Sequence, residues 1–278
     1  MHVRAAAVVA LAFVAVASIA ATGRAQGSNS AAVGKDSAQN AADPRAAQPE
    51  RPTVATHAGT VAPGWVEIET GVERDDFHGA RVLLTPTVLK FGIVPRVQLE
   101  VAGSFQHQSG TLPDYSGIGD VSAALKWRVL EHAPVLGNFA LQPSLKLPSG
   151  SATNGTGTGT TDVGMLLISS HDWGDYALDI NVGYVRRSGD GTVAPKDATL
   201  WTVSSGGPIY KSLGWVVELF GNPRTTGPVG VDGTVALLTG PTYTLEKWLI
   251  LDAGAIIPLT GPQAHAVYAG LTWNIGKL

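Results

Sequence analysis

Apolar and polar residues alternate along much of this chain. In the stretch from Arg96 to Gln106, the apolar positions are Val97, Leu99, Val101 and Phe105, and the polar positions are Arg96, Gln98, Glu100, Ser104 and Gln106. Successive side chains of a β-strand point to opposite faces, so this stretch predicts a strand with one apolar and one polar face. The same pattern is typical of a soluble sheet over a protein core and of a barrel wall between lipid and water.

About twelve segments of this kind follow one another, each of roughly ten residues, a length suited to crossing a bilayer at a tilt. They are residues 65–74, 81–91, 96–106, 119–130, 139–148, 162–171, 175–187, 198–210, 214–221, 233–245, 247–258 and 264–275. No long helix fits between them. The segments predict an all-β fold, a transmembrane antiparallel up-and-down barrel of about twelve strands from Gly64 to Ile275, within a barrel domain of residues 63–278.

The connections support a barrel of the bacterial outer-membrane type. Tight turns at residues 92–95, 172–174, 211–213 and 246–247 alternate with longer loops at residues 108–118, 149–161, 187–197 and 222–231. Short turns on one rim and long loops on the other are typical of outer-membrane barrels. Two features fit less well. Residues 131–138 are long for a turn, and Pro86, Pro143 and Pro241 lie inside predicted strands, where each removes a ladder donor.

Composition narrows the class of protein. Only 15% of the residues are charged, against roughly 25% in a typical soluble domain. The formal net charge of −3 gives no reason to expect a nucleic-acid partner, and the absence of cysteine excludes disulfides and thiolate metal sites. Aromatic residues gather near predicted turns, as in the girdles of a barrel, although aromatics also favour strands in general. They are Trp65, Phe91, Trp173, Tyr176, Tyr210, Trp215, Tyr243, Trp248 and Trp273.

The N-terminal region has a different composition. Arg4 precedes a long uncharged run, and small residues precede a cleavage position after Ala25, so residues 1–25 predict a secretory signal peptide, with a membrane anchor as the alternative. Residues 26–62 are rich in Ala, Ser and Pro and lack apolar periodicity, so we expect a disordered periplasmic linker that contributes only reach. The barrel is then expected in the outer membrane, with lipid and the barrel assembly machinery as partners.

Three successive stretches resemble one family of outer-membrane barrels, known under the description of a putative MetA pathway of phenol degradation. They are "FGIVPRVQLEVAGSF", "GIGDVSAALKWRV" and "LQPSLKLPSGSATNGTGTGTTD". The residues that carry the resemblance are Gly117, Gly119, Asp120, Lys126, Trp127, Arg128, Leu147, Pro148, Ser149 and Gly150. The similarity continues through "WVVELFGN" and "HAVYAGLTWNI" and covers roughly Gly64 to Ile275. It implies an outer-membrane channel or transporter for small molecules, hydrophobic or aromatic compounds among them.

Strand phase predicts which charged residues line the lumen, because a Lys or Arg facing lipid near the midplane costs ~2–4 kcal/mol. The predicted pore-lining residues are Glu69, Arg81, Arg96, Glu100, Lys126, Arg128, Lys146, Asp179, Glu218 and Asp252, together with Glu67. Both signs of charge are present. They are compatible with a transverse field that orients polar solutes, and also with ion pairs that hold the barrel's shape.

Other chemistry receives little support from the sequence. Ser169, His171 and Asp172 are close in sequence, but neighbouring strand residues point to opposite faces and do not form a triad by themselves. The repeat at residues 155–160 lacks the Lys and the helix of a phosphate loop, so we expect a flexible loop there. The seven histidines show no metal-ligand spacing, and we expect neither a metal nor a cofactor. A channel is the leading hypothesis, an occluded structural or surface-binding barrel is the second, and a membrane-embedded lipid hydrolase is the third; we do not expect an enzyme.

Overall fold

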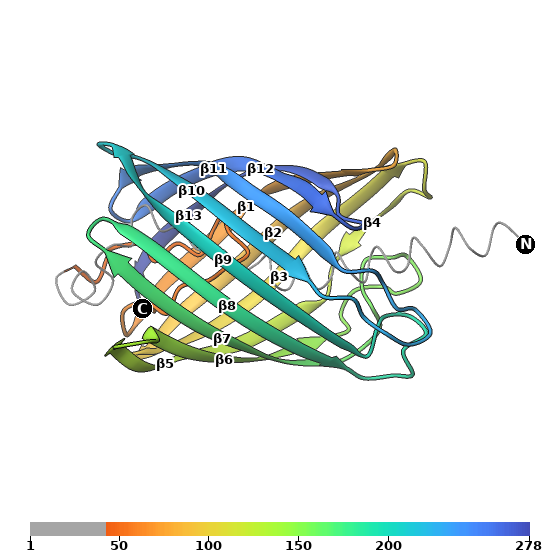
Figure 1. Cartoon of the computed structure of the whole chain (residues 1–278), viewed down its shortest axis with the longest axis horizontal. Helices are drawn as coiled ribbons and strands as arrows, with labels where there is room; N and C mark the ends of the chain where they lie inside the picture. The colour runs from red at the N-terminus through yellow and green to blue at the C-terminus, as the bar shows by residue number, and fades with distance from the viewer. Residues whose placement is uncertain (1–42) are drawn as a thin grey trace, which may run out of the picture.

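The computed structural model describes residues 43–278, and within this range the chain forms a closed antiparallel barrel (Figure 1). Twelve long strands follow the order of the sequence around the wall, and β1 pairs with both β2 and β13, which closes the sheet. The long strands are β1 (Trp65–Phe77), β2 (Ala80–Val94), β3 (Val97–Gly110), β5 (Val121–Ala133), β6 (Gly137–Leu147), β7 (Asp162–Trp173), β8 (Tyr176–Arg187), β9 (Asp197–Tyr210), β10 (Leu213–Asn222), β11 (Thr234–Glu246), β12 (Leu249–Thr260) and β13 (His265–Lys277). A short strand, β4 (Tyr115–Ile118), pairs only with β3. The predicted fold class is confirmed.

The two ends of the barrel differ in their connections. At one end, here called the turn end, β1 begins, β13 finishes and every connection between strands has two or three residues. At the other, the loop end, the connections include residues 111–120, 148–161, 188–196 and 223–233. Residues 131–138, which are long for a predicted turn, mostly extend β5 and β6, so that only residues 134–136 connect these strands. The part of the chain that the structure describes contains no helix long and apolar enough to cross a membrane.

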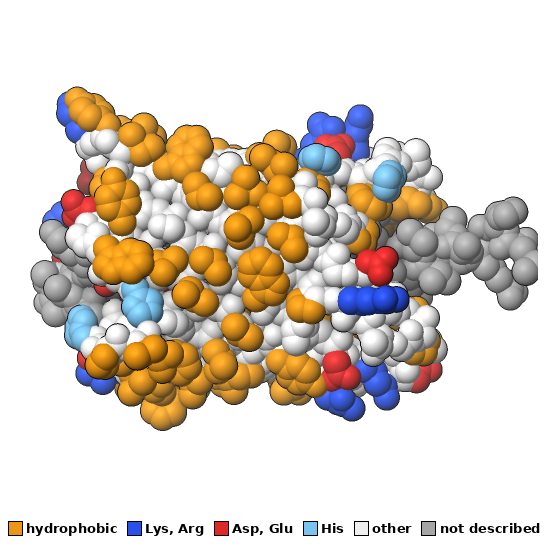
Figure 2. All heavy atoms as spheres, viewed as in Figure 1, with side chains coloured by type: hydrophobic (Ala, Val, Ile, Leu, Met, Phe, Trp, Pro, Cys, Tyr) orange, Lys and Arg blue, Asp and Glu red, His pale blue; other side chains and the backbone are white. Residues whose placement is uncertain are grey.

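The outer face of the barrel carries an apolar band. Figure 2 shows hydrophobic side chains spread over the middle of the wall and charged side chains gathered toward both ends. Leu125, Leu167 and Val182 are exposed on this face, whereas Lys126 on the opposite face is fully buried. The turn end also carries exposed aromatic side chains at Trp173, Tyr176, Tyr210, Trp215, Tyr243 and Trp273. In the middle of the wall, apolar groups therefore face outward and charged groups face inward, as in outer-membrane barrels.

Three of the five prolines in the described strands lie at gaps in the ladders. The pairing of β1 with β2 is interrupted around Pro86, that of β5 with β6 around Pro143, and that of β11 with β12 around Pro241. On its other side, Pro86 still pairs with Ser104 of β3. Because proline has no N–H to donate, each of these strands keeps one neighbour in register and loses contact with the other over a short distance.

The lumen is largely filled. Residues 43–62, here called the strap, begin beside Lys247 at the turn end and cross the inside of the barrel before β1. Every residue from Ala47 to Ala62 is buried except the half-buried Pro52. The expectation of a linker without contacts is therefore wrong for residues 47–62, because the wall supplies their hydrogen-bond partners and apolar neighbours. Residues 26–42 and the predicted signal peptide, 1–25, lie outside the described part of the chain.

The inner wall of β10 to β13 is apolar toward the loop end. Its buried residues form a cluster that includes Val54 of the strap, and Leu200 of β9 packs against it. The other members are Val216, Phe220, Ala236, Leu238, Ile256, Ala266 and Tyr268. Burying such side chains contributes roughly 25 cal/mol per Å² of apolar surface. The cluster therefore anchors the middle of the strap against one side of the barrel.

Candidate functional site: the occupied lumen

The first part of the strap runs beside β1 and is held through its backbone. The N–H of Gln48 donates to Glu67 at 2.7 Å, and the N–H of Glu50 donates to Glu69 at 2.5 Å. Both pairs advance by two residues, in the strap and in β1 alike. Alternate groups of an extended chain point to one side, so two inward glutamates of one strand match two N–H groups of a parallel extended segment. Lys90 completes this contact by donating to the carbonyl oxygen of Gln48 at 2.6 Å.

The next strap residues cross the lumen on similar contacts. Glu218 of β10 accepts the N–H groups of both Val54 and Ala55, each at 2.7 Å. The amide of Asn181 on β8 accepts from the N–H of Thr56 at 2.7 Å and donates to the carbonyl oxygen of the same residue at 2.9 Å. Hydrogen bonds to ionised groups contribute about 1.5–3 kcal/mol. These two wall side chains therefore hold three consecutive strap residues.

The strap then returns to the wall beside β7 and β3. The N–H of Ala58 donates to the hydroxyl of Ser170 at 2.8 Å, and that hydroxyl in turn donates to Asp179 at 2.6 Å. The N–H of Val61 donates to the side chain of Gln98 at 2.7 Å. From Gln48 to Val61, wall side chains thus accept hydrogen bonds from seven backbone N–H groups of the strap.

Glycines in the wall make room for the strap. Gly71 and Gly270 face each other across β1 and β13, and a Cβ at either position would lie within 2.8 Å of the Arg51 guanidinium. A Cβ at Gly92 would lie 2.1 Å from the carbonyl oxygen of Ala62, where the strap leaves the lumen. The space left by these glycines lets Arg51 reach Asp252 of β12, with N–O distances of 3.2 and 3.3 Å.

Two lysines and four glutamates form a buried network where the strap meets β1, β2, β3 and β5. Lys90 lies 2.8 Å from Glu67 and 2.7 Å from Glu69, and none of the three side chains is exposed to solvent. Lys126 contacts Glu50 of the strap directly and lies 3.7 Å from Glu100. A buried charge without a partner is strongly destabilising. Each lysine therefore depends on carboxylates beside it, and Lys126 depends on one that the strap brings.

A second network closes part of the loop end. Lys146 of β6 lies 2.5 Å from Asp120 and 3.3 Å from Asp162, and Arg187 lies 3.3 Å from the same Asp162. The loop of residues 148–161 folds over it, with Thr158 buried and its N–H donating to Asp120 at 3.0 Å. The segment expected to be a flexible loop at residues 155–160 is therefore anchored inside the barrel.

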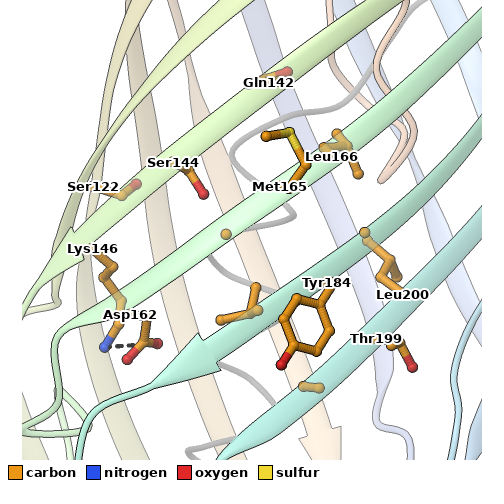
Figure 3. Close-up of a pocket in the computed structure, with 14 residues that line it drawn as sticks. Ser122, Gln142, Ser144, Lys146, Asp162, Met165, Leu166, Tyr184, Thr199 and Leu200 are labelled. Carbon is orange, nitrogen blue, oxygen red and sulfur yellow. Dashed lines mark ion pairs between the residues drawn. The ribbon is translucent and has the colours of Figure 1, made fainter.

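A pocket opens between this network and the strap (Figure 3). One side is polar and includes Ser122, Ser144 and Gln142, while Leu166 and Leu200 line the other side. Leu166 packs against a cluster that contains Ala58 of the strap, and Leu200 packs against the cluster that contains Val54. These two leucines therefore connect the pocket lining to the apolar clusters that contain strap residues. A small molecule with one polar and one apolar face matches this lining.

Eight of the ten predicted pore-lining residues are buried in the barrel interior. They are Glu69, Glu100, Lys126, Arg128, Lys146, Asp179, Glu218 and Asp252, and Glu67 is buried with them. Glu67, Glu69, Lys126, Glu218 and Asp252 contact the strap directly, and Arg128 lies 3.2 Å from Glu131. Whether these residues line a conducting path stays a prediction.

Two of the predicted residues point elsewhere. Arg81 is exposed at the loop-end rim of β2, 3.4 Å from Asp76, and Arg96 is exposed in the turn between β2 and β3, where it pairs with Glu131. The interpretation of both as inward-facing is wrong, because the cost of an outward arginine falls to about 0–1 kcal/mol near the interface. Charge alone predicts an inward direction only in the middle of a strand.

The sequence interpretation also missed functional residues. Glu50 and Arg51 were assigned to the linker, although an adjacent Glu and Arg between prolines is the one charged pair in residues 47–62. Asp120, Asp162 and Arg187 face inward at strand ends, where the phase of the adjoining strand gives the signal. No sequence signal pairs Arg51 with Asp252, because they are 201 residues apart.

The structure gives little support to a hydrolase site at Ser169, His171 and Asp172 or to a metal site among the described residues. The hydroxyl of Ser169 lies 3.1 Å from Nε2 of His171 but also donates to the carbonyl oxygen of Leu136 at 2.8 Å. Asp172 follows on the opposite face of β7, as strand alternation requires. Within residues 43–278, no group of three or more His, Cys, Asp or Glu side chains is arranged to hold a metal ion.

Comparisons with known proteins agree with this architecture. A family model described as "Putative MetA-pathway of phenol degradation" matches residues 50–275. The crystal structure of an outer membrane channel from Pseudomonas putida F1 is similar, with a TM-score of 0.61, 13% sequence identity, and coverage of 77% of this chain and 96% of that one. A structure of the NanC porin has a TM-score of 0.48 and 9% identity, with coverage of 75% and 98%. A search of curated protein sequences finds no match.

Proposed function

The chain belongs to the family described as "Putative MetA-pathway of phenol degradation", and from this premise we propose that it is an outer-membrane channel for small amphipathic molecules. The observation that carries the proposal is the pocket inside a closed barrel, which has serines and a glutamine on one side and leucines on the other. Hydrophobic or aromatic compounds that bear a polar group fit this lining. The similar structure from Pseudomonas putida F1 is itself described as an outer membrane channel, which supports the proposal.

The orientation and the role of the lumen follow from the same premise. The turn end faces the periplasm and the loop end faces the outside, because outer-membrane barrels have short periplasmic turns. The protein acts by passage of solutes and is not an enzyme, and a signal peptide ending near Ala25 brings it across the inner membrane. Since the strap fills the turn-end half of the lumen, passage of a solute requires the strap to move.

One observation favours a second function. Because residues 47–62 and the loop of residues 148–161 both occupy the lumen, an occluded barrel that serves a structural or surface-binding role also accounts for the fold. The two functions differ in whether the strap ever leaves the lumen. A variant that loses only contacts of the strap can therefore distinguish the two functions.

The test compares the wild-type protein with an Arg51→Ala/Val54→Asp variant in planar bilayers. Arg51 loses its pair with Asp252, and an aspartate at position 54 places a charge in the apolar cluster beside Glu218. A channel is expected to show low conductance in the wild type and clearly higher conductance in the variant. A Val135→Asp variant, changed at an exposed turn residue, is the control and should behave as the wild type. If the strap variant conducts no better than the control, the occluded barrel is the correct reading.

A further inference from the structure

The wall recognises the strap by groups that every peptide has. Glu67, Glu69, Glu218, Asn181, Ser170 and Gln98 all receive backbone N–H groups of the strap. Glu50 and Arg51 add charged side-chain contacts, with Lys126 and Asp252. These acceptors satisfy backbone N–H groups that a segment inside the barrel would otherwise leave buried and unpaired.

The spacing of these acceptors matches an extended chain. Glu67 and Glu69 are two residues apart on β1, and they accept from strap residues that are also two apart. Further along, Asn181 both accepts from and donates to the backbone of Thr56, as a neighbouring strand does. Such contacts to the main chain give affinity for extended peptides with little regard to their sequence.

Unused polar groups continue along the same inner surface. The hydroxyls of Thr202 and Ser204 on β9 are fully buried and have no hydrogen-bond partner among the described residues. Ser204 lies opposite Glu218 in the ladder of β9 and β10, and Thr202 lies opposite Asn181 in the ladder of β8 and β9. A buried polar group without a partner costs about 1–3 kcal/mol. Both hydroxyls are therefore available to a ligand that passes these two strap-binding residues.

The surface is also acidic. Six carboxylates line it, and within the described residues only two lysines of the wall lie among them, Lys90 and Lys126. The carboxylates belong to Glu67, Glu69, Glu100, Asp179, Glu218 and Asp252. In the strap, Arg51 pairs with Asp252 and Glu50 pairs with Lys126. The two strap charges cancel, so the strap does not change the net negative charge of the surface. A more basic chain would complement the same surface better than the strap does.

We propose that the inner faces of β1, β3, β7, β8, β10 and β12 form a binding track for an extended oligopeptide, recognised through its backbone, which residues 48–61 occupy from the same chain. The strap is then a resident competitor of the peptide ligand. The inference rests on the proposed function in one respect, because an outside peptide reaches the track only if the lumen opens.

The experiment measures peptide binding to the full-length Arg51→Ala/Val54→Asp protein in detergent, by fluorescence anisotropy. The probe is a labelled peptide of residues 47–62, compared with a peptide of the same composition in a different order and with a third peptide in which residues 54, 55 and 56 are N-methylated. We expect the first two to bind within about threefold of each other. The N-methylated peptide should bind at least about tenfold more weakly, because it lacks three of the N–H donors.

A wall variant serves as the matched control. Adding Glu218→Ala to the strap variant removes the acceptor of two N–H groups and should weaken the binding of all unmethylated peptides, whereas Glu246→Ala, at the exposed turn-end rim, should not. Equal binding of the methylated peptide, binding of the strap sequence alone, or no binding of any peptide would each overturn the track. The assay needs no conductance. A protein that conducts but binds no peptide refutes the track alone, and one that binds peptide without conducting refutes the channel alone.

Discussion

At the scale of single residues, height in the membrane decides where a charge is tolerated. Arg81 and Arg96 are exposed at opposite rims of the barrel, while Lys126 and Lys146 point into the lumen from within their strands. An outward arginine near the rim reaches water and headgroups, whereas one at the midplane finds neither. The phase of a strand therefore constrains charged residues strictly only around its middle.

This rule predicts the effect of an arginine on the outer face. Leu167 lies in the middle of β7 and is exposed to lipid, so Leu167→Arg should lower the free energy of unfolding by about 2–4 kcal/mol. Leu147, at the loop-end limit of β6, is the control, and Leu147→Arg should cost about 0–1 kcal/mol. The measurement is urea unfolding in lipid vesicles. Equal losses at the two positions would contradict the placement of the apolar band.

A second residue-scale prediction concerns Glu218. Glu218→Gln keeps the size of the side chain but turns one acceptor oxygen into a donor, which then faces a strap N–H. Hydrogen exchange of the Val54 and Ala55 amides should become faster by roughly tenfold or more, as expected when a charge-assisted hydrogen bond is lost. The amides of β10 itself should keep their protection. Unchanged exchange at residues 54 and 55 would mean that the apolar cluster alone holds the strap.

At the scale of elements, the strap differs from the strands in what determines it. A strand of this barrel can be recognised in the sequence because apolar and polar residues alternate, as Leu125 and Lys126 do, where its two faces meet lipid and lumen. For this reason all twelve long strands could be predicted. The strap meets the wall on every side, so it needs no periodic face. Its N–H groups find side chains that lie from 19 residues away, at Glu67, to 164 away, at Glu218. Those pairings exist only once the barrel has closed.

The same reasoning explains the partial success of the predicted site. Glu218 and Asp252 were predicted to face inward from local phase, and they do so. Their actual partners, the Val54 amide and Arg51, belong to a segment whose composition is that of a linker. Pro86 is a residue that the sequence marks as unfavourable to a strand. The structure accommodates it in β2, because the ladder between β1 and β2 is interrupted there.

The absence of cysteine from the sequence allows an element-scale prediction for the strap. A single Ala55→Cys, at a fully buried strap position, should react slowly with a water-soluble maleimide, while Val135→Cys, in an exposed turn, should react fast. Adding Glu218→Gln should speed the labelling of Ala55→Cys by roughly tenfold, because the opening of the strap becomes less costly. Fast labelling of Ala55→Cys in the otherwise unchanged protein would show that the strap leaves the lumen without help.

At the scale of the whole molecule, two obstructions lie one behind the other along the lumen. The strap occupies the turn-end half, and the loop of residues 148–161 closes part of the loop end through Asp120 and Lys146. The pocket lies between them. A solute crossing the barrel meets both obstructions in turn, so their resistances to flow add, and the larger one sets the total.

This arrangement predicts how conductance responds to variants at the two ends. Asp120→Asn weakens the contacts of residue 120 with Lys146 and with Thr158 of the loop but leaves the strap in place, so it should change single-channel conductance little. Arg51→Ala/Val54→Asp should raise conductance, and adding Asp120→Asn to it should raise it further, beyond the sum of the separate changes. Removal of the dominant resistance exposes the smaller one, which is why the loop variant matters only after the strap is released. If Asp120→Asn alone opened the channel as widely as the strap variant does, the main barrier would lie at the loop end, and the strap would be a lining of the path and not its closure.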